Sequence, residues 1–173
     1  SFEHLDGYLN LFTPLNRRLY RNRENIPALE IKTFLIDLFK PRFERHNIKF
    51  KHTQGFAGRK LYGFRSTFYP VFVNVIDNAI HWLNQTDIPE KTIRLHADDS
   101  SFYISNNGPE ILPQDKEKIF DLGFTRKRNG RGMGLHISRE VLNAEKYNIY
   151  VDSPKEKSTV TFKIEEIKFD KNE

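Results

Sequence analysis

Gly130-Arg131-Gly132-Met133-Gly134-Leu135 is the stretch that decides the fold of this chain. Three glycines stand at alternate positions and lead directly into an amphipathic run that includes Leu135 and Ile137. Glycine lets backbone N–H groups approach phosphate oxygens closely, and the N-terminus of the following helix attracts the same anion. The stretch therefore predicts a phosphate-binding turn. A glycine-rich turn can also be a plain tight connection, so the neighbouring motifs have to decide between the two.

A second motif lies upstream, in the apolar run from Phe68 to Leu83. Asn74 and Asn78 are four residues apart, so a helix places both amides on one face. Asparagine is a mediocre helix former, and two of them beside a buried apolar stripe need partners. Solvated or capping amides are the alternative to a binding role.

A third motif is Ile104-Ser105-Asn106-Asn107-Gly108-Pro109-Glu110-Ile111, which predicts a strand running into a turn. By itself it is consistent with a simple loop exit. It follows the asparagine helix, however, and precedes Ile119-Phe120, then Gly123-Phe124-Thr125, then the glycine-rich stretch.

In this order the motifs resemble the ATP-binding domain of sensor histidine kinases, a member of the GHKL superfamily shared with gyrase, heat-shock chaperone ATPases and mismatch-repair ATPases. The resemblance runs from about Ile26 to Phe169. It implies a Bergerat-type ATP-binding fold, an α/β two-layer sandwich with a mixed sheet, and it implies ATP and Mg²⁺ as cofactors.

Hydrophobic periodicity independently predicts an α/β domain with a long polar loop over 114–131 that carries only a short helix. The expected elements are a helix over 31–46, a short strand or loop over 61–64, the asparagine helix, and strands over 47–51, 93–97, 102–104, 148–151 and 159–167. Long loops inside compact domains are usually functional lids.

Composition agrees with one such domain and excludes several alternatives. The 173 residues are 38% hydrophobic with fifteen phenylalanines, enough for a real core. A net charge of +5 is too mild to indicate nucleic acid, and the absence of cysteine excludes disulfides and thiolate metal sites. No apolar run is long enough for a membrane span, so we expect a cytoplasmic domain. Because the chain begins Ser-Phe, we expect a fragment of a longer protein.

The first 25 residues are organised differently from the rest. Leucine and phenylalanine repeat at three- and four-residue steps from Phe2 to Leu19, with a basic end after Pro14. The resemblance places the second helix of a dimerisation bundle here. We therefore expect a helical dimerisation segment over 1–25 and an ATP-binding domain over 26–173, with a basic nucleic-acid-binding helix as the alternative.

The resemblance also implies roles for single residues on the asparagine helix. Asn78 matches the Mg²⁺ ligand, and its carbonyl oxygen is a suitable hard donor. Asn74 matches the position at which ATP-hydrolysing relatives carry a glutamate base, and an amide there suits phosphoryl transfer better than hydrolysis. His81 stands where kinases often place a phosphate-contacting cation, and Trp82 where an aromatic residue packs near adenine. A solvent-facing histidine and a plain core tryptophan are the alternatives.

The resemblance implies further nucleotide contacts in the turn, in the loop and before the last strand. They are Asn106, Gly108, Ile111, Thr125, Lys127, Gly130, Gly132, Met133, Gly134, Leu135 and Ser158. The loop also carries the cations Arg126, Arg128 and Arg131, which could face the triphosphate. A basic loop that is only solvated is the alternative.

Three positions depart from the family pattern. Asn106 replaces the aspartate that accepts from the adenine amino group, which removes charge assistance of roughly 1 kcal/mol. Glu110 replaces the second glycine of that motif, and Lys157 replaces a glycine before the last strand, leaving Ser158 as the hydroxyl nearest the base. These departures predict weakened nucleotide binding.

The predicted function is transfer of the γ-phosphoryl group of ATP to a histidine of a protein or domain, by a chain that forms homodimers through its N-terminal helix. His4 is a candidate acceptor because acidic residues lie close to it on both sides, although a surface helix residue is the simpler interpretation. The alternatives are an ATP-gated conformational switch or ATPase of the same superfamily, and a degenerate scaffold that binds no nucleotide.

Overall fold

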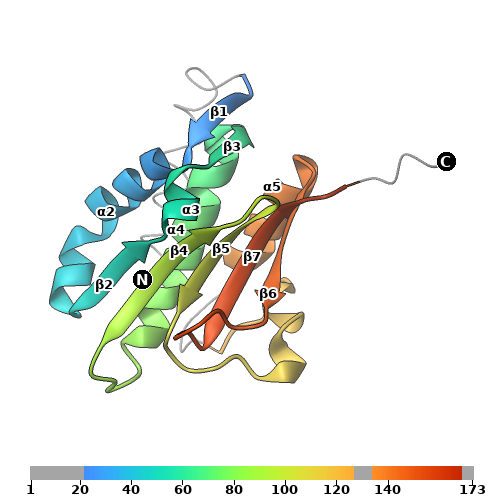
Figure 1. The fold of residues 1–173 in the computed structure, drawn as a ribbon. Coiled ribbons are helices and arrows are strands. Elements are labelled where there is room, and N and C mark those ends of the chain that lie inside the picture. Colours follow the sequence, from blue (N-terminus) through green and yellow to red (C-terminus); the bar gives the residue numbers. More distant parts are fainter. Residues whose placement is uncertain (1–21, 127–133, 169–173) are drawn as a thin grey trace.

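Five strands form one mixed sheet in the order β2-β4-β5-β7-β6. The computed structural model describes residues 22–126 and 134–168. The strands are β2 (Ile48–His52), β4 (Lys91–Ala97), β5 (Ser101–Asn106), β6 (Tyr147–Asp152) and β7 (Val160–Glu166). β2 runs parallel to β4, and the other neighbours are antiparallel. Figure 1 shows this sheet in front of the helices.

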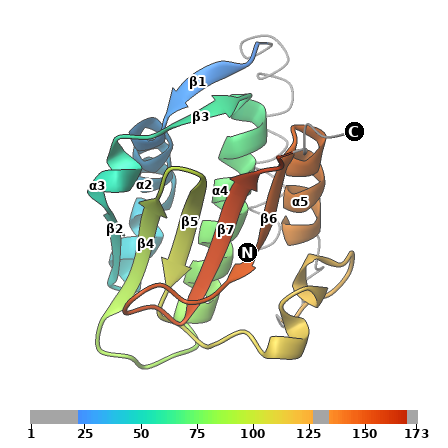
Figure 2. The same ribbon diagram turned by 45° about the vertical axis from the view of Figure 1, so that its right-hand side comes forward.

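Helices α2 (Ala28–Arg45), α4 (Arg65–Leu83) and α5 (Gly134–Ala144) cover one face of the sheet. α4 is the central helix, between α2 and α5 (Figure 2). It is apolar almost all round, and Phe68, Phe72 and Ile76 are fully buried against the sheet and the neighbouring helices. An all-round apolar helix of this length belongs in a core, and α4 accordingly organises the two layers.

Shorter elements complete the domain. These are β1 (Glu24–Pro27), α3 (Gln54–Ala57), β3 (Lys60–Gly63) and the 3₁₀ turns η1 (Pro113–Asp115) and η2 (Lys118–Phe120). β1 and β3 form a separate two-stranded antiparallel sheet. Arg65, in the first turn of α4, binds Glu24 of β1 and Glu30 of α2, so β1 is fastened to both helices.

The structure confirms the expected two-layer α/β sandwich with a mixed sheet. The expected N-terminal helix lies in residues 1–21, outside the described residues. β1 begins at Glu24 and pairs through Asn25 with Tyr62, so the expected domain boundary after residue 25 falls inside this strand. Within the described ranges, no helix combines the length and apolarity that crossing a membrane requires.

Candidate nucleotide-binding site

Asn74 links α4 to the beginning of α5. Its side chain is buried, with 3% of the residue exposed, and its Nδ2 donates to Gly134 O at 3.0 Å and to Ser138 Oγ at 2.8 Å. Ser138 Oγ in turn donates to Gly134 O at 2.8 Å. Asn74 Oδ1 is buried and has no partner among the described residues. Asn74 therefore holds the end of the glycine-rich segment against α4.

Asn78 lies one turn further along α4. It is half-buried, and in residues 22–126 and 134–168 its amide makes no hydrogen bond. The preceding Asp77 instead forms an ion pair with Arg42 of α2. These contacts separate two flanks of α4: Asp77 faces α2, and Asn74 faces α5.

The turn after β5 packs against the C-terminal end of α4. Asn106 is 6% exposed, and its Oδ1 accepts from Gly108 N at 2.9 Å. A Cβ on Gly108 would lie 3.1 Å from Asn106 Oδ1 and 3.5 Å from Leu83 Cδ2, so a larger residue would have to displace one of them. Glycine at this position therefore permits the close approach of the turn to α4.

Asn107 fixes the same turn from its other side. Its Nδ2 donates to Glu90 O at 2.7 Å and its Oδ1 accepts from Thr92 N at 2.9 Å. The two neighbouring asparagines thus have different tasks: Asn107 joins β5 to the start of β4, and Asn106 faces the helical layer.

The hydroxyl that reaches the Asn106–Gly108 turn is that of Thr159. Thr159 N donates to Asn106 O at 2.9 Å, and Thr159 Oγ1 donates to Gly108 O. Ser158, which the sequence suggested for this place, donates its hydroxyl to Lys155 O at 2.5 Å. The reason is register: β7 pairs Val160 with Asn106, which brings the residue just before Val160 beside the turn.

Lys157 adopts φ 60°, the left-handed region that favours glycine. The resemblance predicts a glycine at this position, and the backbone adopts a conformation that favours glycine although a lysine occupies it. A non-glycine residue in this region costs about 1 kcal/mol.

The predicted loop is anchored at its root. Buried Asp115 of η1 accepts two hydrogen bonds from Arg126, at 3.2 Å from Nε and 3.1 Å from Nη2. These bonds raise the pKa of the Arg126 guanidinium. η2 is fastened to α5, because His136 contacts Phe120 O at 3.1 Å and the Arg139 guanidinium lies 3.8 Å from the Phe120 ring centroid. Figure 2 shows this segment beside α5. Arg126 is thus engaged by a carboxylate rather than displayed for a ligand.

The other predicted site residues are distributed as follows. His81 and Trp82 are half-buried in the last turn of α4, with ring centroids 4.9 Å apart at 86°. Ile111 and Leu135 are partly buried against the core. Thr125 is half-buried next to Arg126. Lys127, Arg128, Gly130, Arg131, Gly132 and Met133 lie outside the described residues, as does His4.

Sequence reasoning missed three participants. Thr159 could have been found from its place beside Ser158, had the register of β7 been known. Asp115 and Ser138 gave no signal, because a single carboxylate in a polar loop and a single serine in a helix have no characteristic spacing. Among the described residues, no three histidine or acidic side chains lie close enough together to hold a metal ion. A cation at Asn78 would therefore need phosphate oxygens and water as its other ligands.

A fold in which helices cover one face of a mixed sheet, with paired asparagines on the central helix and a glycine turn at its end, is that of an ATP-binding module. The family model described as "Histidine kinase-, DNA gyrase B-, and HSP90-like ATPase" matches residues 63–168, and the chain belongs to this family. The resemblance proposed from the ordered motifs is confirmed: the chain is an ATP-binding domain of the sensor histidine kinase type.

Individual relatives agree with this assignment. The sensor histidine kinase WalK of Bacillus subtilis (strain 168) is 30% identical over 152 residues, which cover 82% of this chain and 24% of WalK. The chain therefore corresponds to about a quarter of that relative's length. The catalytic domain of histidine kinase ThkA, in a nucleotide-free form, superposes with a TM-score of 0.67 at 26% identity and covers 85% of this chain and 96% of the ThkA chain. ThkA in complex with the response regulator protein TrrA matches at a TM-score of 0.63 and 21% identity, covering 99% of this chain and 48% of that one, which shows the fold alone.

Proposed function

We propose that this domain binds Mg-ATP along the flank of α4 that carries Asn74 and Asn78, and that it donates the γ-phosphoryl group to a histidine of a protein partner. One observation supports the proposal above all. The glycine-rich segment ends on α4 at Asn74, and the Gly108 turn meets α4 at Leu83. Nine residues of helix separate these contacts, about 14 Å at the rise of an α-helix. The phosphate-binding and base-binding motifs thus contact α4 at two points along its length, and Asn78 lies between these points in the sequence of the helix.

Asn78 is suited to hold the cation. Its amide is half-buried and makes no hydrogen bond within the part of the chain described, so its oxygen is available as a hard ligand. Bound Mg²⁺ would neutralise charge on the nucleotide phosphates. Asn106, Gly108 and Thr159 form the opposite end, where the base would lie.

Asn74 is unsuited to activate water. An amide accepts no proton at neutral pH, and the nitrogen of this one is already committed to Gly134 and Ser138. We therefore propose slow hydrolysis and transfer to another acceptor. Asn74 acts by holding α5 in place, so that the first turn of α5 faces the phosphates.

The whole-protein properties are proposals of the same kind. We propose that the dimerisation helix expected over 1–25 ends before β1 (Glu24–Pro27) and precedes the ATP-binding domain expected over 26–173, and that the longer protein works as a homodimer in the cytoplasm. His81 is proposed as a phosphate neighbour and Trp82 as a base neighbour. Because ThkA has been captured with a response regulator, we propose a response regulator as the downstream partner.

The decisive experiment compares Asn78→Ala with Asn84→Ala, a control at the end of the same helix. Affinity for ATP is measured by calorimetry and by the emission of Trp82, the single tryptophan, with Mg²⁺ and with EDTA. We expect Asn78→Ala to lose at least tenfold in Mg²⁺ and less than threefold in EDTA, with Asn84→Ala unchanged. Equal losses in both buffers would make Asn78 structural, and absence of binding at millimolar Mg-ATP would favour the scaffold interpretation.

Transfer itself is tested with the full-length protein and γ-labelled ATP. An acid-labile, base-stable label on protein supports phosphorylation of histidine. Brisk release of free phosphate without that label would contradict the proposal and favour an ATP-gated switch.

A further inference from the structure

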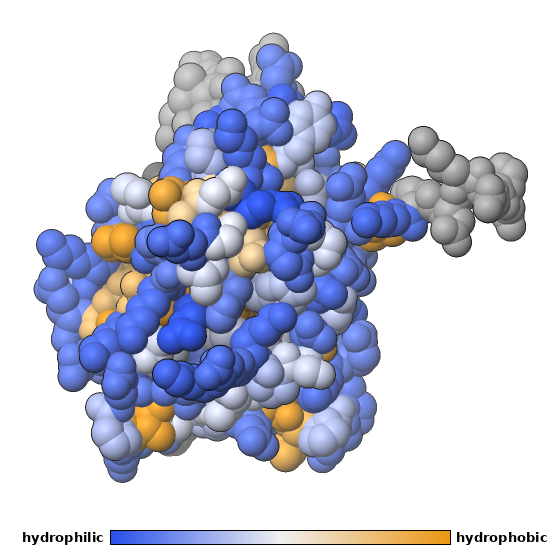
Figure 3. Space-filling view, viewed as in Figure 1, coloured by the Kyte–Doolittle hydropathy of each residue, from blue (hydrophilic) through white to orange (hydrophobic). Residues whose placement is uncertain are grey.

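A cavity of about 240 Å³ lies on the outer face of the sheet, opposite the helices. Its lining includes Lys51, Arg94 and Ser105, which are register partners across β2, β4 and β5. The residues that alternate with them, such as Ile93 and Ile104, belong to the core under the helices. Most of the cavity therefore lies across the sheet from the helices, and it meets the proposed base-binding turn at Asn106, which also belongs to its lining. Figure 3 shows this outer face as predominantly hydrophilic, with long side chains crossing it.

The turn between β6 and β7 forms one wall of the cavity. Glu156, Lys157 and Ser158 line it. Lys155 fixes the turn to the sheet, because its Nζ lies 3.9 Å from the Tyr103 ring centroid. Below the turn, the hydroxyls of Thr161 and buried Ser105 are 2.8 Å apart. The wall and floor are thus built from ordered contacts rather than from loosely placed surface chains.

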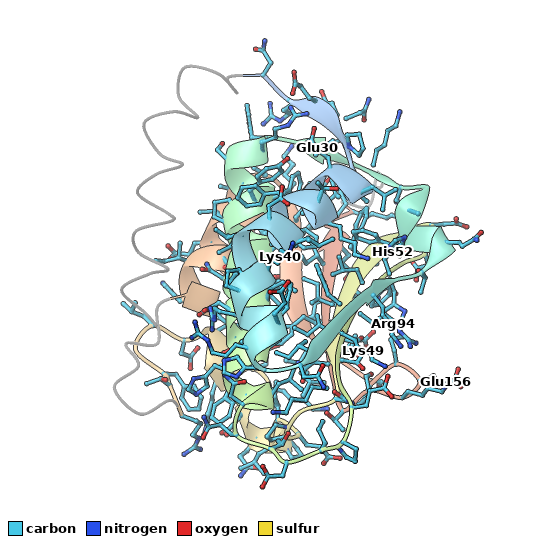
Figure 4. The ribbon with its side chains drawn as sticks, turned by 90° about the vertical axis from the view of Figure 1, so that its left-hand side faces the viewer. Glu30, Lys40, Lys49, His52, Arg94 and Glu156 are labelled. Atoms are coloured by element: carbon cyan, nitrogen blue, oxygen red, sulfur yellow. The ribbon has the colours of Figure 1, made fainter. Side chains whose placement is uncertain are left out.

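Positive charge predominates around the cavity. Arg94 has no ion pair among the described residues, and Lys157 is exposed at the rim. Lys51 shares the single carboxylate of Glu90 with Lys49, at 3.6 Å and 3.2 Å. Glu156 is the other carboxylate in the lining. Figure 4 shows Arg94 and Glu156 on the side of the sheet away from α2.

His96 supplies an independent sign of a missing partner. It lines the cavity, and its Nε2 is buried without a hydrogen bond to any residue in the described ranges. Buried polar atoms are nearly always satisfied, so an unpaired buried nitrogen on a residue of the lining is exceptional. Burial together with the charges of Arg94 and Lys155 lowers the pKa of His96 to about 4, so the ring is neutral at pH 7.

We propose that this outer-face cavity binds a small phosphorylated molecule, with its phosphate group held by Arg94 and Lys157. Arginine presents a planar fork of donors that matches phosphate oxygens, and lysine adds a point charge. The Thr92 hydroxyl and the neutral His96 ring offer further polar contacts in the same lining. Arg94 and Lys157 are not among the residues proposed to bind ATP, so this inference does not depend on the proposed kinase function.

The test is an NMR titration of the chain with glycerol 3-phosphate and with inorganic phosphate, at constant ionic strength. We expect shifts at Thr92, Arg94, Ser158 and the His96 ring. Arg94→Ala should weaken binding at least tenfold, and Arg94→Lys about threefold. The control Lys60→Ala removes an equal charge from an exposed site outside the cavity and should change binding less than twofold.

Three results would overturn the proposal. Absence of shifts at 20 mM glycerol 3-phosphate would show that the cavity takes no phosphate ester. Shifts confined to α4 and α5 would place binding at the nucleotide site instead. Equal weakening by Arg94→Ala and Lys60→Ala would show that general charge attraction, not a built site, is responsible.

Discussion

Replacing Asn106 by aspartate tests how this domain distinguishes purines. The Asn106 amide is held in one orientation, because its Oδ1 accepts from Gly108 N at 2.9 Å. Rotating the amide by 180° would set Nδ2 against that N–H and lose the bond. The fixed amide therefore presents a donor, Nδ2, beside an acceptor that keeps a second lone pair. Such a pair can accept from the adenine amino group or donate to the guanine carbonyl without moving.

The magnitude follows from these contacts. An aspartate keeps the bond from Gly108 N and adds charge to the bond with adenine, a gain of roughly 1 kcal/mol. For guanine it removes the Nδ2 donor and sets a carboxylate against a carbonyl, a loss of about 1 kcal/mol or more. The ratio of ATP to GTP affinity should therefore rise on the order of tenfold, which corresponds to about 1.4 kcal/mol. Because the residue is only 6% exposed, the new charge also destabilises the free protein, but this cost is common to both nucleotides and cancels in the ratio.

The assay is four dissociation constants, for Mg-ATP and Mg-GTP with the wild type and with Asn106→Asp. Asn107→Asp is the matched control, since it makes the same change one residue further on, at a side chain bound to Glu90 and Thr92. We expect a weak preference for ATP in the wild type and in the control. Strong rejection of GTP by the wild type, unaltered in Asn106→Asp, would refute the reasoning and assign discrimination to the shape of the site.

Two predictions concern stability. The pKa of His96 is lowered from 6.5 to about 4 by burial and by Arg94 and Lys155, so between these pH values the unfolded chain binds a proton that the folded chain does not. The free energy of unfolding should therefore fall as the pH falls from 7 to 4.5, by about 1–2 kcal/mol more in the wild type than in His96→Gln. Urea unfolding measures this difference, and parallel pH profiles of the two proteins would contradict it. Lys146 follows α5 with φ 63°, so Lys146→Gly should raise the free energy of unfolding by about 0.5–1 kcal/mol. The control Asn47→Gly, at φ 52°, should change the free energy of unfolding little, because asparagine tolerates this region. A loss of stability in Lys146→Gly would show that the side-chain contacts of Lys146 outweigh the backbone strain.

Much of the fold could be predicted because its elements have strong periodic patterns. The helix over 31–46 and the hairpin of 93–97 and 102–104 correspond to α2 and to β4 with β5, within a few residues at each end. The element expected over 61–64 corresponds to β3, but β1 and its pairing with β3 could not be predicted, since a four-residue strand has no usable periodicity and the partners lie 33 or more positions apart. The loop over 114–131 was expected to hold one short helix, and the described part holds two 3₁₀ turns.

The local geometry of the candidate site was predictable where the spacing within a motif determines it. Asn74 and Asn78 lie one turn apart on α4, as their spacing requires, and Gly108 makes the close approach that glycine allows. Contacts between elements that are far apart in the chain could not be predicted from the sequence. The bond from Asn74 to Gly134 spans 60 positions, and the choice of Thr159 over Ser158 depends on strand register, which a one-residue change would reverse.

The departures from the family pattern act on charge more than on shape. Lys157 adopts the left-handed backbone region that favours glycine, and Thr159 in the same turn reaches Gly108. Glu110 is exposed and is not among the residues of positive φ in the described chain, so this position makes no demand that only glycine could meet. Asn106 keeps the bond to Gly108 that an aspartate would also make. Since the turn packs on Leu83 with these three residues in place, we expect any weakening of nucleotide binding to come from the missing carboxylate at residue 106, so Asn106→Asp should raise affinity for ATP.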